Sequence, residues 1–212
     1  PLNDYGFCAS DPLDLVTTAN PGIYVCGAAQ SPKDIPDSVQ QGSSAAAQAT
    51  ALLADARGSQ VTAPSSHAER DVSAEAPCIG VFVCHCGINI AGVVDVTAVA
   101  EFAATLPDVK YASHCMFACS TDQLQEIKKA IKDHALNRVV VASCTPRTHE
   151  PLFRNTLREA GLNPYLFELA NIREQDAWVH QAEPQIATHK AKELVKMSVA
   201  RARLLEPLYE TS

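Results

Sequence analysis

The feature that most constrains the fold is a regular alternation of strand-like and helix-like segments that begins at Cys78. Short runs rich in Val, Ile and aromatic residues predict strands over 79–83, 109–112, 138–142 and 165–169. The segments between and after them predict helices over 95–106, 121–134, 148–160 and 184–205. Because strands that alternate with helices pair in parallel, we expect an α/β fold with a small parallel, Rossmann- or flavodoxin-like sheet and flanking helices.

The chain has eight cysteines, and five of them follow the expected strands. Cys84 and Cys86 come after the first strand, Cys115 and Cys119 after the second, and Cys144 after the third. In a parallel sheet these strand ends lie along one edge, where helix N-termini also point. The topology therefore predicts that five thiols from three chain segments meet at one point.

Four convergent thiolates suit a [4Fe-4S] cluster, in which each iron takes one cysteine. Ser120 is expected to cap the following helix, which puts Cys119 where backbone N–H groups can bond sulfur. The ligands that we expect are Cys84, Cys86, Cys119 and Cys144, with Cys115 able to replace one of them.

Other chemistry of the same thiols stays open. Four thiolates also form a closed structural zinc site, although the paired Cys-x2-Cys knuckles that such sites usually have are missing from the chain. A metal-free docking domain and a redox dithiol are further alternatives, but the chain has no Cys-x-x-Cys motif. Absorption of visible light distinguishes an iron-sulfur cluster from zinc.

Residues near these loops receive structural roles. His85 is expected to point to the opposite face of the sheet from its two neighbouring cysteines. His114 is expected to lie at the surface or to cap a helix, and Trp178 to lie in the core. Cys26 stands in an apolar run, so we expect it to be buried in a strand.

Residues 1–55 contain one strand-like run, Gly22–Cys26, then a turn and a helix over about 37–54. One strand and one helix cannot bury a core, so this segment is expected to be the remnant of a larger domain. The chain does not begin with Met, which indicates a piece of a longer polypeptide. Residues 56–77 are polar and small, and they predict a linker.

Charge and hydropathy exclude some partners. The formal net charge of −7 gives no positive field for nucleic acid or an anionic membrane. No apolar run is long enough to span a bilayer, and the first residues lack the pattern of a signal peptide. We expect a cytoplasmic protein with no nucleic-acid partner and no membrane insertion.

Three long motifs, Val81–Ile90, Val139–Glu150 and Asn163–Glu168, resemble the amino-terminal domain of the heterodisulfide reductase A subunit. The pair Cys119-Ser120 also fits, and the match covers about residues 78–208. In that family the domain carries a [4Fe-4S] cluster and precedes a thioredoxin-reductase-like FAD domain. The resemblance implies that the cluster ligands fall on Cys84, Cys86, Cys119 and Cys144.

Residues 1–55 resemble a different part of the same family, the closing segment of its FAD domain. The likeness is carried by Pro21–Ala28 and Pro32–Asp37, although related flavin enzymes commonly place Asp where Ala28 stands. The glycine-rich dinucleotide fingerprint is missing from the chain, so we do not expect it to retain FAD. In the full-length protein the residues that would face FAD are Gly27, Ala28, Asp34 and Ile35.

The order of these segments predicts a tandem fusion of two units that each resemble the A subunit, with this chain at the junction. The expected parts are an FAD-domain tail over 1–55, a linker over 56–77, an iron-sulfur domain over 78–182, and a helix over 183–212 that connects to a following flavin domain. The resemblance implies one part of a heterodisulfide reductase-like oxidoreductase. It would relay electrons between the cluster and FAD, in the flavoprotein remainder of the same polypeptide, or other iron-sulfur subunits, without catalysis by this segment alone.

Overall fold

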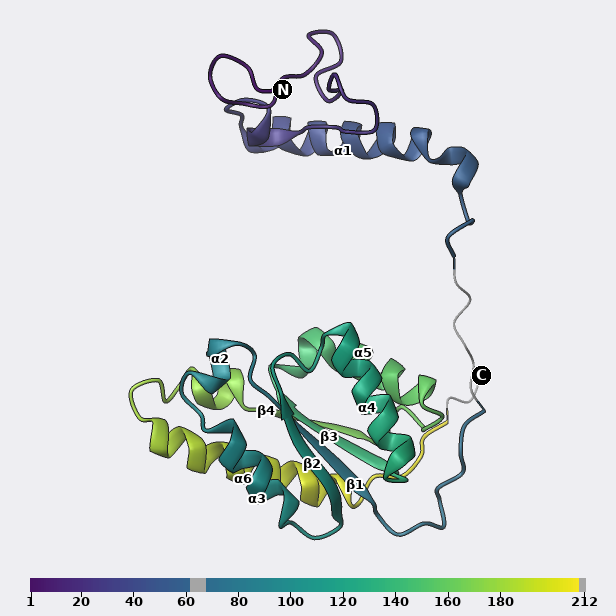
Figure 1. Cartoon of the computed structure of the whole chain (residues 1–212), viewed down its shortest axis with the longest axis vertical. Coiled ribbons are helices and arrows are strands. Elements are labelled where there is room, and N and C mark those ends of the chain that lie inside the picture. Colours follow the sequence, from purple (N-terminus) through teal and green to yellow (C-terminus); the bar gives the residue numbers. More distant parts are fainter. Residues whose placement is uncertain (62–67, 210–212) are drawn as a thin grey trace. The chain divides into compact units, whose positions relative to one another are not determined.

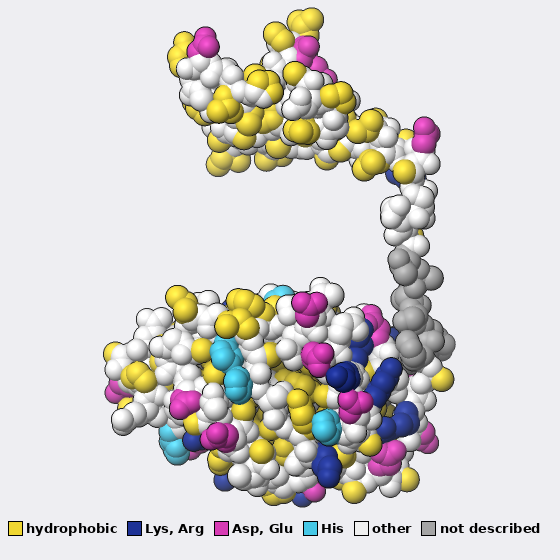
Figure 2. Space-filling model, in the orientation of Figure 1, with side chains coloured by type: hydrophobic (Ala, Val, Ile, Leu, Met, Phe, Trp, Pro, Cys, Tyr) yellow, Lys and Arg dark blue, Asp and Glu magenta, His cyan; other side chains and the backbone are white. Residues whose placement is uncertain are grey.

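The structure is a computed structural model that describes residues 1–61 and 68–209. It contains two compact units, Pro1–Pro64 and Ser65–Ser212 (Figure 1). On the face shown in Figure 2, acidic and basic side chains are interspersed over the second unit, whereas the first unit shows mainly hydrophobic and uncharged side chains. Each unit is described separately below.

The first unit is built around helix α1, Ile35–Leu52. The side chain of Asp34 caps it by accepting a hydrogen bond from the Asp37 N–H at 2.8 Å, and Pro36 stands in its first turn, where proline is favoured. Within this helix only Gln41 is buried. The short 3-10 helices Gly27–Ala29 and Ala54–Ala56 lie before and after it.

The strand expected over Gly22–Cys26 is replaced by an isolated antiparallel bridge between Thr17 and Tyr24. Cys26 is exposed rather than buried, which corrects the expectation from its apolar neighbours. A strand needs a partner along its length to satisfy its backbone groups, and the described residues of this unit offer only that single bridge in this segment.

The second unit contains a four-stranded sheet in which all the pairings are parallel, in the order β2-β1-β3-β4. Its strands are β1 Ile79–Cys84, β2 Val109–Cys115, β3 Arg138–Ser143 and β4 Phe167–Asn171. The two inner strands, β1 and β3, are buried along their whole length, as their continuous apolar runs require. The expected parallel α/β fold is confirmed.

Helices cover both faces of this sheet (Figure 1). Helices α3 and α6 share one core with the sheet, while α4 and α5 share the other. A short helix and a single π-helical turn, neither of which was expected, complete the unit. The bounds are α2 Ile88–Ala91, α3 Val96–Ala104, α4 Thr121–Asp133, α5 Pro146–Glu159, the π-helical turn Arg173–Ala177, and α6 Pro184–Ala202.

The segment just before β1 also packs on the second unit. Val72 is fully buried in the core that α4 and α5 form with the sheet. The Arg70 N–H donates to the carbonyl of Gly161 at 2.8 Å, next to the C-terminus of α5. Part of the sequence expected as a linker over 56–77 is therefore packed against the α/β unit, whereas residues 62–67 of that range lie outside the described residues.

Candidate metal centre

The first cysteine loop begins where β1 ends. Cys84 is the last residue of the strand and is buried, and the Cys86 N–H donates to its sulfur at 3.3 Å. Cys86 and Gly87 have φ values of +48° and +57°. A positive φ is unfavourable for a residue with a side chain, and such strain clusters at functional sites. The chain thus turns sharply here and keeps both thiols at the carboxyl edge of the sheet.

Cys115 lies directly beside Cys84. The two residues are partners in the register of β1 with β2, and each ends its strand. The Cys115 thiol donates a hydrogen bond to the Cys84 sulfur, which lowers the pKa of Cys84 to about 6 and raises that of Cys115. Cys84 therefore favours the thiolate form that binds metals, whereas Cys115 holds its proton.

Cys119 stands at the entry of α4. Ser120 caps this helix by accepting a hydrogen bond from the Gln123 N–H, as the sequence predicted. The N–H of Ala118, one residue before Cys119, donates to the Cys84 sulfur at 3.3 Å. Burial raises the pKa of Cys119, and the charges of Cys84 and Cys86 add to this rise. The second loop is thus folded against the sulfur of the first.

Cys144 follows β3 and precedes Thr145, which caps α5. It is buried, and burial raises the pKa of its thiol. The charge of Cys86 adds to this rise, so these two sulfurs are close enough to interact electrostatically.

The parallel sheet brings the ends of β1, β2 and β3 to one edge, as expected. All five predicted cysteines lie there and are reduced. Among the described residues, however, no three His, Cys, Asp or Glu side chains already stand where they could hold a metal ion. The donor chemistry fits a cluster, since the thiols are free and sulfur already accepts N–H hydrogen bonds. The ligand set Cys84, Cys86, Cys119 and Cys144 remains a prediction.

The structure adds a residue that the sequence did not reveal. Arg173 follows β4, at the same edge of the sheet, and its Nη1 donates to the Cys86 sulfur at 3.1 Å. Its guanidinium lies over the ring of Trp178, with 4.9 Å from Cζ to the centroid. Trp178 is 46% exposed, so its expected place in the core is wrong. The signal available in the sequence was only that a fourth strand must end at this edge.

The histidines near the thiols pair with each other. His85 Nε2 and His114 Nδ1 are 2.9 Å apart, and their rings are packed with centroids 5.0 Å apart. Burial lowers the pKa of His85, and the nearby His114 lowers it further. His114 lies at the surface, as expected.

The residues expected to face FAD lie together at one end of α1. Asp34 caps the helix and Ile35 is its first residue, 79% exposed. Gly27, at φ +61°, donates its N–H to Gln41 Oε1 and lies beside Ser38 in the first turns of α1. Ala28 is in the same 3-10 helix as Gly27. Their role toward FAD remains a prediction.

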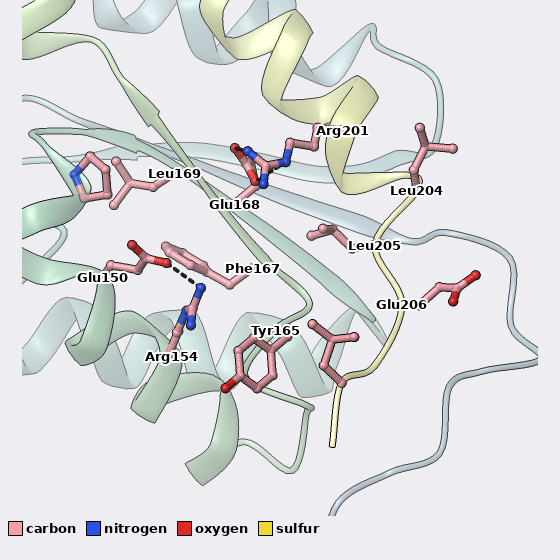
Figure 3. A pocket seen from close by; sticks show the side chains of 12 residues that line it. Glu150, Arg154, Tyr165, Phe167, Glu168, Leu169, Arg201, Leu204, Leu205 and Glu206 are labelled. Atoms are coloured by element: carbon pink, nitrogen blue, oxygen red, sulfur yellow. Dashed lines mark hydrogen bonds and ion pairs between the residues drawn. The ribbon is translucent and has the colours of Figure 1, made fainter. Parts of the chain in front are cut away.

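A hollow of about 520 Å³ lies away from the thiols, beside β4 and the end of α6 (Figure 3). Its charged side chains pair with one another, Glu150 with Arg154 and Glu168 with Arg201. Burial raises the pKa of Glu168, and Arg201 opposes this rise. The residues that line the hollow include no cysteine, so the candidate centre does not lie there.

Comparison with known proteins gives close relatives for part of the chain. It is 57% identical over 140 residues to the A subunit of the H(2):CoB-CoM heterodisulfide,ferredoxin reductase of Methanothermobacter thermautotrophicus, a match over 66% of this chain and 21% of that protein. It is 60% identical over 134 residues to an iron-sulfur A subunit, numbered 2, of the CoB–CoM heterodisulfide reductase of Methanopyrus kandleri, over 63% of this chain and 20% of that protein. No family model matches the chain.

The same likeness extends to Methanosarcina mazei, in which the A subunit of the ferredoxin:CoB-CoM heterodisulfide reductase is 54% identical over 134 residues, over 63% of this chain and 17% of that protein. The chain thus spans about a fifth of the length of these curated relatives. Among the helices of the described residues, none is long and apolar enough to cross a membrane. Over about two thirds of its length, the chain is a homologue of part of the heterodisulfide reductase A subunit, as its motifs indicated.

Proposed function

We propose that the second unit is an iron-sulfur electron-transfer domain, in which Cys84, Cys86, Cys119 and Cys144 hold a [4Fe-4S] cluster. The observation that carries the proposal is that these thiols, on loops after three parallel strands, lie at one edge within electrostatic reach of each other. The name of the Methanopyrus relative, an iron-sulfur subunit, supports the same assignment. When bound, such a cluster supplies a one-electron redox centre.

The chain's own residues prepare the site in three ways. Burial of Cys84 and Cys144 keeps water from these sulfurs. The N–H groups of Cys86 and Ala118 orient the Cys84 sulfur and stabilise its negative charge. The Cys115 thiol supports Cys84 by a further hydrogen bond, which favours a supporting role for Cys115 over a ligand role.

Exposed apolar side chains next to the cysteine loops support a protein as the redox partner. Five of them follow the cysteines or Arg173 along the chain, and Phe117 lies beside Gly87. Exposed apolar residues of this kind are typical of surfaces that contact other proteins. They are Ile88, Met116, Phe117, Trp178 and Val179.

We propose as the partners the FAD-bearing remainder of the full-length protein, to which Gly27, Ala28, Asp34 and Ile35 would belong, and iron-sulfur subunits of a heterodisulfide reductase-like complex. The relatives' names as subunits, and the ferredoxin named for two of them, support such a redox chain. The segment by itself would relay electrons without catalysing the reaction of the complex, in a cytoplasmic setting.

The test is metal analysis of protein purified and reconstituted anaerobically with iron and sulfide. We expect bound iron and inorganic sulfide, broad visible absorbance, and an electron paramagnetic resonance signal after reduction with dithionite. Changing Cys84, Cys86, Cys119 or Cys144 to Ala should remove or alter that signal, whereas Cys115→Ala should retain it.

The matched control is Cys78→Ala, because Cys78 precedes β1 at the opposite end of the strand from Cys84. Its cluster signal should equal that of the unchanged protein, and far-ultraviolet circular dichroism should show that every variant is folded. Stoichiometric zinc without iron would replace the proposal by a structural zinc site. Folded protein without any metal would leave the metal-free docking domain.

A further inference from the structure

Arg173 is held in one place by three separate contacts. Its Nη1 donates to the Cys86 sulfur at 3.1 Å, and its Nη2 pairs with Glu174 Oε1 at 2.6 Å. The face of its guanidinium lies on the ring of Trp178. Hydrogen bond, ion pair and stacking together restrain a side chain that would otherwise sample many rotamers.

The backbone at this point is unusual and explains the arrangement. Residues Arg173–Ala177 form a π-helical turn, in which the N–H of Trp178 bonds the carbonyl of Arg173 at 2.9 Å. The wider turn brings the side chains of Arg173 and Trp178 together, which is the pairing that the ring contact records. Single π-helical turns occur frequently at functional sites.

The positive charge of Arg173 reaches the predicted ligands selectively. It donates to Cys86, and its charge lowers the pKa of Cys84, Cys119 and Cys144, against the burial that raises the last two. For Cys115, the contributions come instead from Cys84, Cys119 and burial. The cation therefore acts on the same four sulfurs that the sequence selected.

We propose that Arg173 is a positioning residue of this site, which fixes the Cys86 sulfur and raises the reduction potential of the cluster. The inference rests on the function proposed above. Reduction adds one electron, and a fixed positive charge stabilises the more negative, reduced form. Hydrogen bonds to the sulfurs act in the same direction, since they draw negative charge from the ligand.

The experiment is a redox titration of the reconstituted protein, followed by the electron paramagnetic resonance signal. Arg173→Gln should lower the midpoint potential by an amount equal to about a tenfold change in the reduction equilibrium, which is about 59 mV for one electron. Arg173→Lys keeps the charge but loses the planar donor, so its potential should lie between the two.

Two further variants separate this effect from general damage. Arg147→Gln removes an exposed arginine from the first turn of α5, three residues after Cys144, and should leave the potential unchanged. Glu174→Gln removes the negative charge paired with Arg173 and should raise the potential. Opposite signs for the two paired residues are expected from charge and not from a loss of structure.

Iron and sulfide contents are measured on every sample. If the unchanged protein binds neither, the proposed function fails, whatever the variants do. If it binds both and Arg173→Gln titrates at the same potential, the role of Arg173 is overturned and the cluster assignment stands. If Arg173→Gln does not load, Glu174→Gln and Arg173→Lys decide, and an unchanged potential in both overturns the inference.

Discussion

Asp176, three residues after Arg173, is a carboxyl group in an unfavourable place. It is fully buried, and neither carboxylate oxygen has a hydrogen-bond partner among the described residues. Burial raises its pKa from 3.8 to about 6, although His180 and Lys190 act in the opposite direction. The folded protein therefore favours the protonated form more than the unfolded chain does.

This shift makes the stability of the fold depend on pH. For a group whose pKa is higher when folded, stability is greatest below the unfolded pKa and falls as pH rises through the folded pKa. Asp176→Asn should therefore raise the free energy of unfolding at pH 7.5 by about 1–3 kcal/mol, with a much smaller gain near pH 4. Urea unfolding of metal-free protein, followed by the fluorescence of the single Trp178, measures both values.

The matched control is Glu126→Gln, which neutralises an exposed carboxylate within α4. It should leave the dependence of unfolding on pH unchanged. An Asp176→Asn protein whose stability changes with pH as steeply as that of the unchanged chain would contradict the role given to Asp176.

At the scale of single residues, the sequence predicted which cysteines gather but not what surrounds them. The position of Cys84 and Cys144 at strand ends is a local property, read from the apolar runs that precede them. The contact of Arg173 with Cys86 joins residues 87 positions apart and depends on an unforeseen π-helical turn. Trp178 is exposed for the same reason, because it stacks on that arginine.

At the scale of elements, predictions held where local patterns decide the structure. Helix α4 was foreseen from its capping pair, and β1 and β3 from their continuous apolar runs. Strand β4 begins two residues later than expected, at Phe167. The Asn163 side chain accepts a hydrogen bond from the Tyr165 N–H at 3.0 Å, which keeps that segment in a turn. Such a side-chain bond competes with strand formation and is not visible in residue periodicity.

Gly80 shows how tightly β1 is packed. It lies inside an inner strand, and a Cβ atom at this position would collide with the Leu136 Cδ1 atom and press on Phe82. Both neighbours are buried and cannot move into solvent. Gly80→Ala should therefore lower the free energy of unfolding by about 1–3 kcal/mol, the usual cost of overpacking a core. Urea denaturation measures it.

A double-mutant cycle tests whether the collision is the cause. Leu136→Val shortens the side chain that meets the new methyl group, so the two changes together should cost less than the sum of the single changes. Strictly additive losses would show that the strain at Gly80 arises elsewhere in the strand.

At the scale of the molecule, both hydrophobic cores belong to one unit. All their buried residues lie between Val72 and Ala202, so the second unit holds what it needs to fold. The first unit buries little by comparison: α1 has 18 residues and a single buried one, and Leu13 and Ile35 are largely exposed. This is the packing expected for a segment whose larger domain is elsewhere.

Removing residues 1–64 should therefore leave the cooperative unfolding transition of the second unit and its iron and sulfide content unchanged. Residues 1–61 alone should lack a cooperative transition and lose most of their helical signal, because an isolated helix of this length is marginal in water. Circular dichroism during thermal unfolding measures both. The argument depends on where the buried side chains lie, so a truncated protein with a broadened transition would mean that the α/β unit draws stability from residues outside its own cores.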